Sequence, residues 1–199
     1  FFPPRQATHG TGGLAGVWAE ENTRSSLFSS MRRRETFATS GPRIRVRFFG
    51  GSQLPKDVAK AADPVAVAYT NGVPMGGMLE APSQNPPTFF VWAARDPKSA
   101  PLQRAQIIKG WVENGEAKEI VFDVACADGI KPDPTTHRCA DNGASVDLAN
   151  CLISHDKGAV ELQAGWTDPN YQPNQHAFYY ARVLENPSCR WSTWDAIRL

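Results

Sequence analysis

The sequence lacks the features of several common classes of protein. It has no run of about 18 apolar residues, so no segment is predicted to span a membrane as a helix. Its net charge is only +1 at pH 7, which argues against nucleic acid or an anionic membrane as the main partner. It has neither an initiating Met nor a signal peptide, and we therefore expect a processed product or a fragment of a longer protein.

Familiar catalytic and metal-binding motifs are also missing. There is no H-x-H, H-E-x-x-H, C-x-x-C or G-x-S-x-G pattern, and the four histidines are scattered at His9, His137, His155 and His176. Surface or capping roles are therefore favoured over metal ligation for these histidines. The stretch 72–77 is rich in glycine, but Pro74 and Met75 interrupt its amides, which favours a turn or bulge over a phosphate-binding loop. The sequence thus predicts no metal site and no cofactor within this chain.

The residues that are present indicate a globular, turn-rich protein. The 199 residues suffice for one large or two small domains with a hydrophobic core. Hydrophobic residues make up 41% and charged residues 21%, and 16 glycines and 16 prolines favour turns and short strands over long helices. Residues 1–13 are predicted to form an extended or poorly ordered leader.

The stretch 16–51 is predicted to be a short buried strand, a helix, a turn and a second strand. Thr23 or Asn22 can cap a helix over 23–35, because either side-chain oxygen can accept from the free N–H groups of its first turn. One face of this helix is apolar, formed by Leu27, Phe28 and Met31. The other face is rich in serine and arginine, so this helix requires a partner surface.

Strand patterns dominate the rest of the chain, at 65–69, 73–79, 88–94, 105–112, 118–125, 159–166 and 176–185. Asn114-Gly115 predicts a hairpin, and a helical turn is expected around 58–62. Trp92, Trp111 and Trp166 are interpreted as core rather than as a sugar platform, and the two tryptophans of the tail are expected to pack back on the domain. We therefore predict a mainly β protein: an antiparallel β-sandwich of seven or eight strands with one N-terminal helix-containing segment. An eight-stranded barrel is the alternative.

The four cysteines all lie in the C-terminal part of the chain. Their even number in loop-rich sequence favours two disulfides, and thus an oxidising compartment, over free thiols. Three pairings are formally open. We favour Cys126–Cys139, which closes a Pro-rich loop, and Cys151–Cys189, which ties the loop at 126–158 to the tail.

Charged residues give only weak site candidates. Glu20 and Glu21 precede the predicted helix, where acids also stabilise the helix dipole, and Arg24 follows them. Arg43, Arg45 and Arg47 alternate along the second strand and form a row that suits an anion or, more simply, an interdomain salt-bridge surface.

Long phrases of the sequence resemble the C-terminal part of a known bacterial family. GLAGVWAEENTRSSLFSSMRRRETFATSGPRIRVRFFGG, PLQRAQIIKGW, DPTTHRCADNGASVDLANC and TDPNYQPNQHAFYYARVLENPSCRWSTWDA are similar to domain-of-unknown-function family 3604. Members of this family resemble the PHP superfamily of metal-dependent hydrolases, whose H-x-H and later Asp/His motifs bind metal on a distorted (β/α) barrel. None of those motifs matches a position of this sequence.

The resemblance implies a C-terminal accessory portion of a divalent-metal hydrolase that acts on an unknown small molecule. Residues 1–42 would be the remnant of an upstream (β/α) catalytic domain, and 43–199 a β-sandwich domain. The family often looks exported, which agrees with a periplasmic or extracellular location. The alternatives are a non-catalytic binding module, for carbohydrate through exposed tryptophans, and an independent enzyme that uses the acids before the helix. The unpartnered helix face also leaves a homo-oligomer open.

Overall fold

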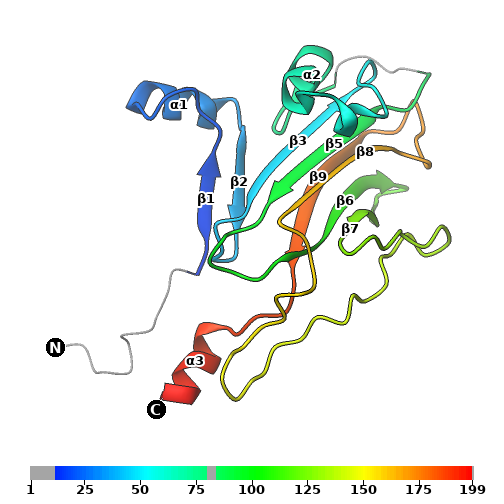
Figure 1. Cartoon of the computed structure of the whole chain (residues 1–199). Helices are drawn as coiled ribbons and strands as arrows, with labels where there is room; N and C mark the ends of the chain where they lie inside the picture. Colours follow the sequence, from blue (N-terminus) through cyan, green and yellow to red (C-terminus); the bar gives the residue numbers. More distant parts are fainter. Residues whose placement is uncertain (1–11, 80–83, 199) are drawn as a thin grey trace.

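A computed structural model of the protein describes residues 12–79 and 84–198. Its strands are β1 Leu14–Val17, β2 Thr36–Thr39, β3 Arg45–Gly51, β4 Val73–Pro74, β5 Thr88–Ala94, β6 Leu102–Glu113, β7 Glu116–Cys126, β8 Glu161–Thr167 and β9 Ala177–Glu185. Its helices are α1 Arg24–Arg32, the 3₁₀ turn η2 Val58–Lys60, α2 Pro64–Asn71 and α3 Trp191–Arg198. The strands form three antiparallel sheets, ordered β1-β2, β4-β3-β5-β8 and β7-β6-β9, so the protein is mainly β, as predicted (Figure 1).

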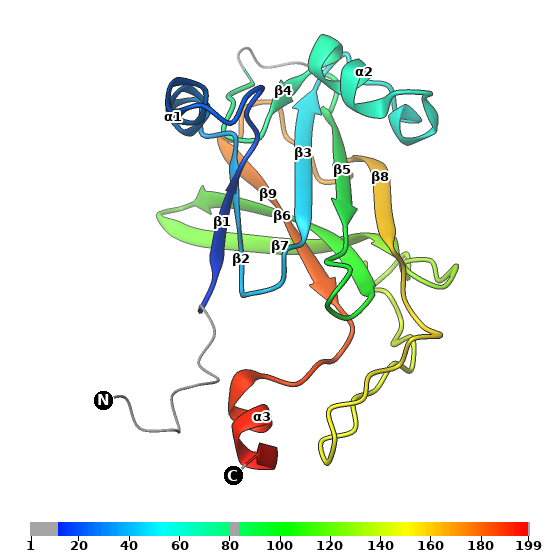
Figure 2. The same ribbon diagram turned by 60° about the vertical axis from the view of Figure 1, so that its left-hand side comes forward.

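The four-stranded and three-stranded sheets face each other as a sandwich (Figure 2). Side chains alternate along a strand, so Phe48 and Phe89 point into the space between the sheets, where they meet Leu102 and Ile107 of β6. Phe49 and Phe90 point to the opposite face of the four-stranded sheet. Each of the two main sheets therefore contributes to one shared core, and the four-stranded sheet also has a covered outer face.

Helical segments cover that outer face, which corrects one of our expectations. The predicted strand at 65–69 is wrong, because this segment lies in α2. Asp63 caps α2 by accepting from the Ala66 N–H at 2.9 Å, Pro64 begins it, and Ala68 is fully buried against the sheet. Alternating valines at 65 and 67 suggested a strand, but the Asp-Pro start and the covered sheet face stabilise a helix.

The strand predicted at 73–79 is limited to β4. The Gly77 N–H donates to the Pro74 oxygen at 3.0 Å, and Gly76 has a φ of 80°, so the chain turns directly after Pro74. The strands predicted at 88–94, 105–112, 118–125, 159–166 and 176–185 are all present, some with shifted ends. The predicted hairpin joins β6 to β7 through Asn114 and Gly115, both of which have positive φ.

The N-terminal module consists of β1, α1 and β2. The Thr23 hydroxyl accepts from the Ser26 N–H at 3.3 Å and so caps α1. The helix is shorter than predicted, because Arg34 has a φ of 62° and reverses the chain into β2, a strand that the sequence analysis missed. Of its apolar face, Leu27 is partly buried, whereas Phe28 and Met31 are 57% and 54% exposed. The division of the chain at residue 42 stays a prediction, and most of the predicted leader at 1–13 lies outside the described residues.

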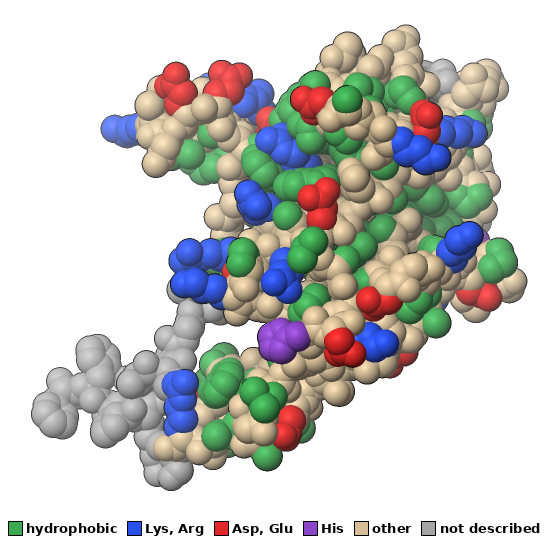
Figure 3. Space-filling view, in the orientation of Figure 1, with side chains coloured by type: hydrophobic (Ala, Val, Ile, Leu, Met, Phe, Trp, Pro, Cys, Tyr) green, Lys and Arg blue, Asp and Glu red, His purple; other side chains and the backbone are tan. Residues whose placement is uncertain are grey.

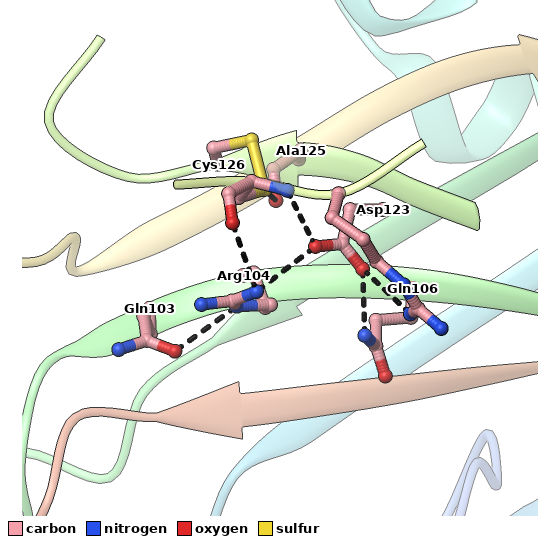
Figure 4. The surroundings of a disulfide bond; sticks show 8 residues. Gln103, Arg104, Gln106, Asp123, Ala125 and Cys126 are labelled. Carbon is pink, nitrogen blue, oxygen red and sulfur yellow. Dashed lines mark hydrogen bonds and ion pairs between the residues drawn. A yellow bond between two sulfur atoms is a disulfide. The ribbon is translucent and has the colours of Figure 1, made fainter. Parts of the chain in front are cut away.

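Both disulfides have the pairing that we favoured, Cys126–Cys139 and Cys151–Cys189. The first encloses the beginning of the long loop between β7 and β8. Figure 4 shows how Asp123 holds this region: its fully buried carboxylate accepts from the Cys139 N–H at 2.7 Å, Arg104 Nη1 at 3.0 Å and Gln106 Nε2 at 2.6 Å. A disulfide and a fully paired buried carboxylate thus fix a loop that has little secondary structure.

The tail does not pack back on the domain as expected. It forms α3, which has no buried residue, and Trp191 is 54% exposed. α3 follows directly after Cys189 and is therefore tied by the second disulfide to the tip of the long loop. Among the described residues, no helix combines the length and the apolar character needed to cross a membrane.

Candidate functional site

A junction cluster of Trp18, Glu35, Arg47 and Tyr69 connects the N-terminal module to the sandwich. The Trp18 indole N–H donates to the Val46 oxygen at 2.7 Å, and the Arg47 guanidinium carbon lies 3.7 Å from the centre of the Trp18 ring. Arg47 Nη1 donates to the Tyr69 hydroxyl at 3.0 Å, and that hydroxyl donates to the buried Glu35 carboxylate. One residue each from β3, α2, the end of β1 and the start of β2 therefore meet in a single network.

The charges and hydrogen bonds of this cluster suit a structural contact between the N-terminal module and the sandwich. Burial raises the pKa of Tyr69 above its ordinary value of 10.0, and the hydrogen bond to Glu35 and the charge of Glu35 raise it further. Tyr69 therefore remains a neutral donor at physiological pH, and its proton stays on the hydrogen bond to Glu35. Arg33 lies 3.7 Å from the other carboxylate oxygen of Glu35. This arrangement fixes the position of the N-terminal module and leaves no side chain of the junction cluster available as a general base.

The acidic candidates lie away from this cluster. Glu20 and Glu21, in the segment that leads into α1, and Arg24, the first residue of α1, are all exposed. The Glu21 backbone N–H donates to the Ser26 hydroxyl at 3.3 Å. These three candidates line neither of the two cavities described below. Their predicted role in contacting substrate stays a prediction.

The row of arginines at and just before β3 is divided among different environments. The Arg43 N–H donates to Asp96 Oδ2 at 2.8 Å, and this bond, together with one from the Lys98 N–H, lowers the pKa of Asp96. Arg45 is exposed, whereas Arg47 belongs to the junction cluster. The two functions considered for this row, an anion site and an interdomain surface, both stay predictions.

An open groove lies at one end of the sandwich, and sequence reasoning missed it. Its volume is about 1010 Å³, and it lies between the 73–79 loop, the facing ends of β3 and β5, and the segment that leads into β9. Its walls include Phe48, Phe89, Met75, Met78, Phe178, Tyr179, Arg34 and His176. Met75 and Met78 lie in the loop after β4 and belong to no strand. Because methionine side chains adapt to bound molecules, these two methionines are the one sequence signal that could have indicated a surface for binding.

A buried ion pair stands behind one wall of the groove. Lys109 Nζ donates to Asp168 Oδ2 at 2.7 Å, and the Tyr179 hydroxyl donates to the same oxygen at 2.7 Å. Lys109 also lines a smaller cavity of about 310 Å³ beside Trp111 and Gln175. Burial, followed by the hydrogen bond to Asp168, raises the pKa of Tyr179 far above its ordinary value. Tyr179 is therefore a neutral, fixed wall of the groove.

The described residues offer no ligand set for a metal ion, since no group of three or more His, Cys, Asp or Glu side chains meets among residues 12–79 and 84–198. His137 packs on Phe122, with 4.9 Å between ring centres, and His155 and His176 are exposed. His9 lies outside the described residues.

Comparison with known protein families gives a match over most of the chain. The model of the family described as "Protein of unknown function (DUF3604)" matches residues 4–199. Comparisons with curated proteins and with solved structures give no match. Because the family match extends over almost the whole chain, the protein belongs to the DUF3604 family.

Proposed function

We propose that this chain is the C-terminal accessory portion of a larger, PHP-like metal-dependent hydrolase, and that its N-terminal module docks on an upstream catalytic domain. One observation carries the proposal. Phe28 and Met31 are more than half exposed beside a sheet in which, among the described strands, β1 and β2 pair only with each other. An isolated two-stranded sheet is marginally stable in water, and exposed apolar surface marks interaction sites.

The form of the molecule supports docking at this place. The module with α1 and the tail with α3 stand out as separate projections from the body in the space-filling view (Figure 3). Both carry exposed apolar side chains, Phe28 and Met31 on one and Trp191, Trp194 and Ile197 on the other. The junction cluster fixes the module on the sandwich, so an upstream domain seated on α1 would be held in a defined position relative to the sandwich.

The proposed division of labour leaves the chemistry to the upstream domain. The described residues do not fit a divalent metal, so we derive no step of hydrolysis for this chain. In the proposal, this chain alone is inactive, and the exposed Glu20, Glu21 and Arg24 lie near the docking face, where they can contact the upstream domain or its substrate.

Reconstitution from two polypeptides tests the proposal. The upstream part of the encoded protein and this chain are produced separately, and their dissociation constant is measured by calorimetry. We expect binding, weakened about tenfold or more by Phe28→Ser with Met31→Ser, since each buried apolar side chain contributes about 1.5–3 kcal/mol. Val112→Ser, at an exposed valine at the end of β6, serves as the matched control.

Three outcomes decide against the proposal. These are the absence of an encoded upstream domain, a lack of binding, and equal weakening by the control variant. Self-association of this chain that is lost in the Phe28 and Met31 variant would assign the face to a second copy instead. Hydrolytic activity of this chain by itself would refute the accessory role.

A carbohydrate-binding module is the second candidate, because Trp191 and Trp194 of α3 are 54% and 37% exposed. Exposed tryptophan rings are the surface that such modules use to stack on sugars. Binding to soluble glycans that is lost in Trp191→Ala with Trp194→Ala, while binding of the upstream domain is retained, would favour it.

We also propose export to the periplasm or the extracellular space, which the two disulfides support. Cell fractionation of the natural host with an antibody to this chain tests the location. Recovery from the cytosol with free thiols would contradict export.

A further inference from the structure

We propose that the groove at the end of the sandwich binds a small aromatic carboxylate. Its volume of about 1010 Å³ is at the upper end of the range that is usual for small-molecule sites, roughly 300–1000 Å³. Arg34, in the turn between α1 and β2, contributes to the groove together with residues of the sandwich. The inference does not depend on the proposed docking of an upstream domain, because its test uses this chain by itself.

The walls of the groove suit a flat apolar body. Phe48 and Phe89 are stacked with their ring centres 5.7 Å apart, and the ring centres of Tyr179 and Phe89 are 4.3 Å apart. At the rim, Met78 is 72% exposed and Phe178 61% exposed. Thioether and aromatic side chains adapt to the faces and edges of rings, so a bound arene would cover the exposed surface of Met78 and Phe178 at the rim.

The charge of the groove is one-sided. Arg34 and His176 line it, whereas no aspartate or glutamate lines it among the described residues. The structure gives the Arg34 side chain no ion pair with any other described residue. A guanidinium beside an apolar surface favours a carboxylate over a neutral or cationic group, because its charge-assisted bonds match the planar carboxylate.

Two acidic groups close to the described walls of the groove are already engaged. Glu35 follows Arg34 in sequence, but it accepts from Tyr69 and pairs with Arg33. Asp168 stands behind Tyr179, but Lys109 pairs with it at 2.7 Å and their side chains are almost completely buried. Neither of these two carboxylates is therefore free to neutralise Arg34, so the charge that the described walls offer is positive.

Three naphthalene probes of equal shape and different charge test this inference on the chain as it exists. The dissociation constants of 2-naphthoate, 2-naphthylmethanol and 2-naphthylmethylamine are measured by calorimetry at low salt. We expect saturable binding of one 2-naphthoate per chain, roughly tenfold or more tighter than either other probe, as one charge-assisted hydrogen bond provides. Added salt should weaken only the naphthoate.

Two groove variants and one matched control complete the experiment. Arg34→Gln should reduce the affinity for 2-naphthoate to that for the alcohol, whereas Arg45→Gln, at another exposed arginine outside the groove, should leave it unchanged. Met78→Glu, at a rim position too exposed to disturb folding, should invert the preference towards the amine. Equal affinities for the three probes, or an unchanged preference in Arg34→Gln and Met78→Glu, would overturn the assignment.

Discussion

Lys109 and Asp168 illustrate at the residue scale how this fold tolerates charge in its interior. Asp168 accepts from Lys109, from the Tyr179 hydroxyl and from the Asn170 N–H at 2.8 Å, and Lys109 also donates to the Asn170 oxygen at 2.7 Å. The groups of this network belong to β6, to β9 and to the segment between β8 and β9. The pair therefore ties this segment, which forms one wall of the groove, to the three-stranded sheet.

Removal of one member of this pair is predicted to be costly. Lys109→Met leaves Asp168 as a buried charge without its cation, and we expect a loss of about 3–5 kcal/mol in the free energy of unfolding. Urea denaturation measures it. Asp168→Asn added to Lys109→Met should cost less than the sum of the single variants, because both remove the same interaction. Additive losses would show that the pair is not coupled.

Glu185 gives a prediction for pH dependence. Burial raises its pKa above the ordinary 4.5, against the opposing effect of the Ser99 and Ser188 hydroxyl donors. A raised folded-state pKa means that the stabilisation is present below the unfolded value and is lost as pH rises through the folded value. As the pH rises from about 4 through the raised folded-state pKa, the wild type should therefore lose unfolding free energy relative to Glu185→Gln.

Asp96 provides a control of opposite sign. Its pKa is lowered by the N–H groups of Arg43 and Lys98, so its stabilisation is present above the unfolded pKa and is lost as pH falls through the folded value. Unfolding of Asp96→Asn over the same pH series should show a deficit at neutral pH that disappears in acid. A Glu185→Gln difference that does not change with pH would contradict the first part of this prediction.

At the scale of elements, we expect the disulfide that closes the shorter loop to contribute more to the global free energy of unfolding than the one that closes the longer loop. Chain entropy alone assigns about 3 kcal/mol to Cys126–Cys139 and about 4 kcal/mol to Cys151–Cys189, with separations of 13 and 38 residues. However, the first pair closes on the buried Asp123 network, whereas the second ties exposed α3 to a loop tip. The second can therefore open with little loss of the core.

Serine variants of each pair test this order. Cys126→Ser with Cys139→Ser should lower the global unfolding free energy by about 3 kcal/mol. Cys151→Ser with Cys189→Ser should lower it by less, but should raise hydrogen exchange in α3. A larger global loss from the second pair would contradict this order.

The elements that the sequence predicts well are those whose signals are local. Asn114-Gly115 supplies the two positive φ values that the β6–β7 turn requires, and Thr23 supplies the cap of α1. By contrast, α2 was predicted as a strand, because alternation at Val65 and Val67 is compatible with both structures until the sheet face that covers Ala68 is known. Packing against the sheet, rather than the local sequence pattern, therefore determines that this segment is a helix.

The groove and the junction cluster could not be predicted from sequence. Arg34 and His176 are 142 positions apart in the chain (176 − 34). They line one surface only because the fold brings the turn after α1 and the segment before β9 together beside β4. Similarly, Glu35, Arg47 and Tyr69 have no common motif, and only the packing of β3 against α2 and the module joins them. The role of the row of arginines stays a prediction; the structure places only Arg47 in the junction cluster.

At the scale of the whole molecule, the proposed roles of the two parts of the structure differ. The sandwich has its own core, shared by the two larger sheets. The N-terminal module has a small sheet, a helix with two exposed large side chains, and attachment through the junction cluster. The module should therefore be the less stable part of the isolated chain and should gain the most from a docked partner.

Hydrogen exchange followed by mass spectrometry tests this central claim most directly, with the isolated chain compared with the longer protein that the proposal requires. The account predicts that amides of β1, α1 and β2 exchange more slowly, by about tenfold or more, in the longer protein. Amides of the β6–β7 hairpin should exchange equally in both. Equal exchange of the N-terminal module in the two proteins would contradict the proposed docking.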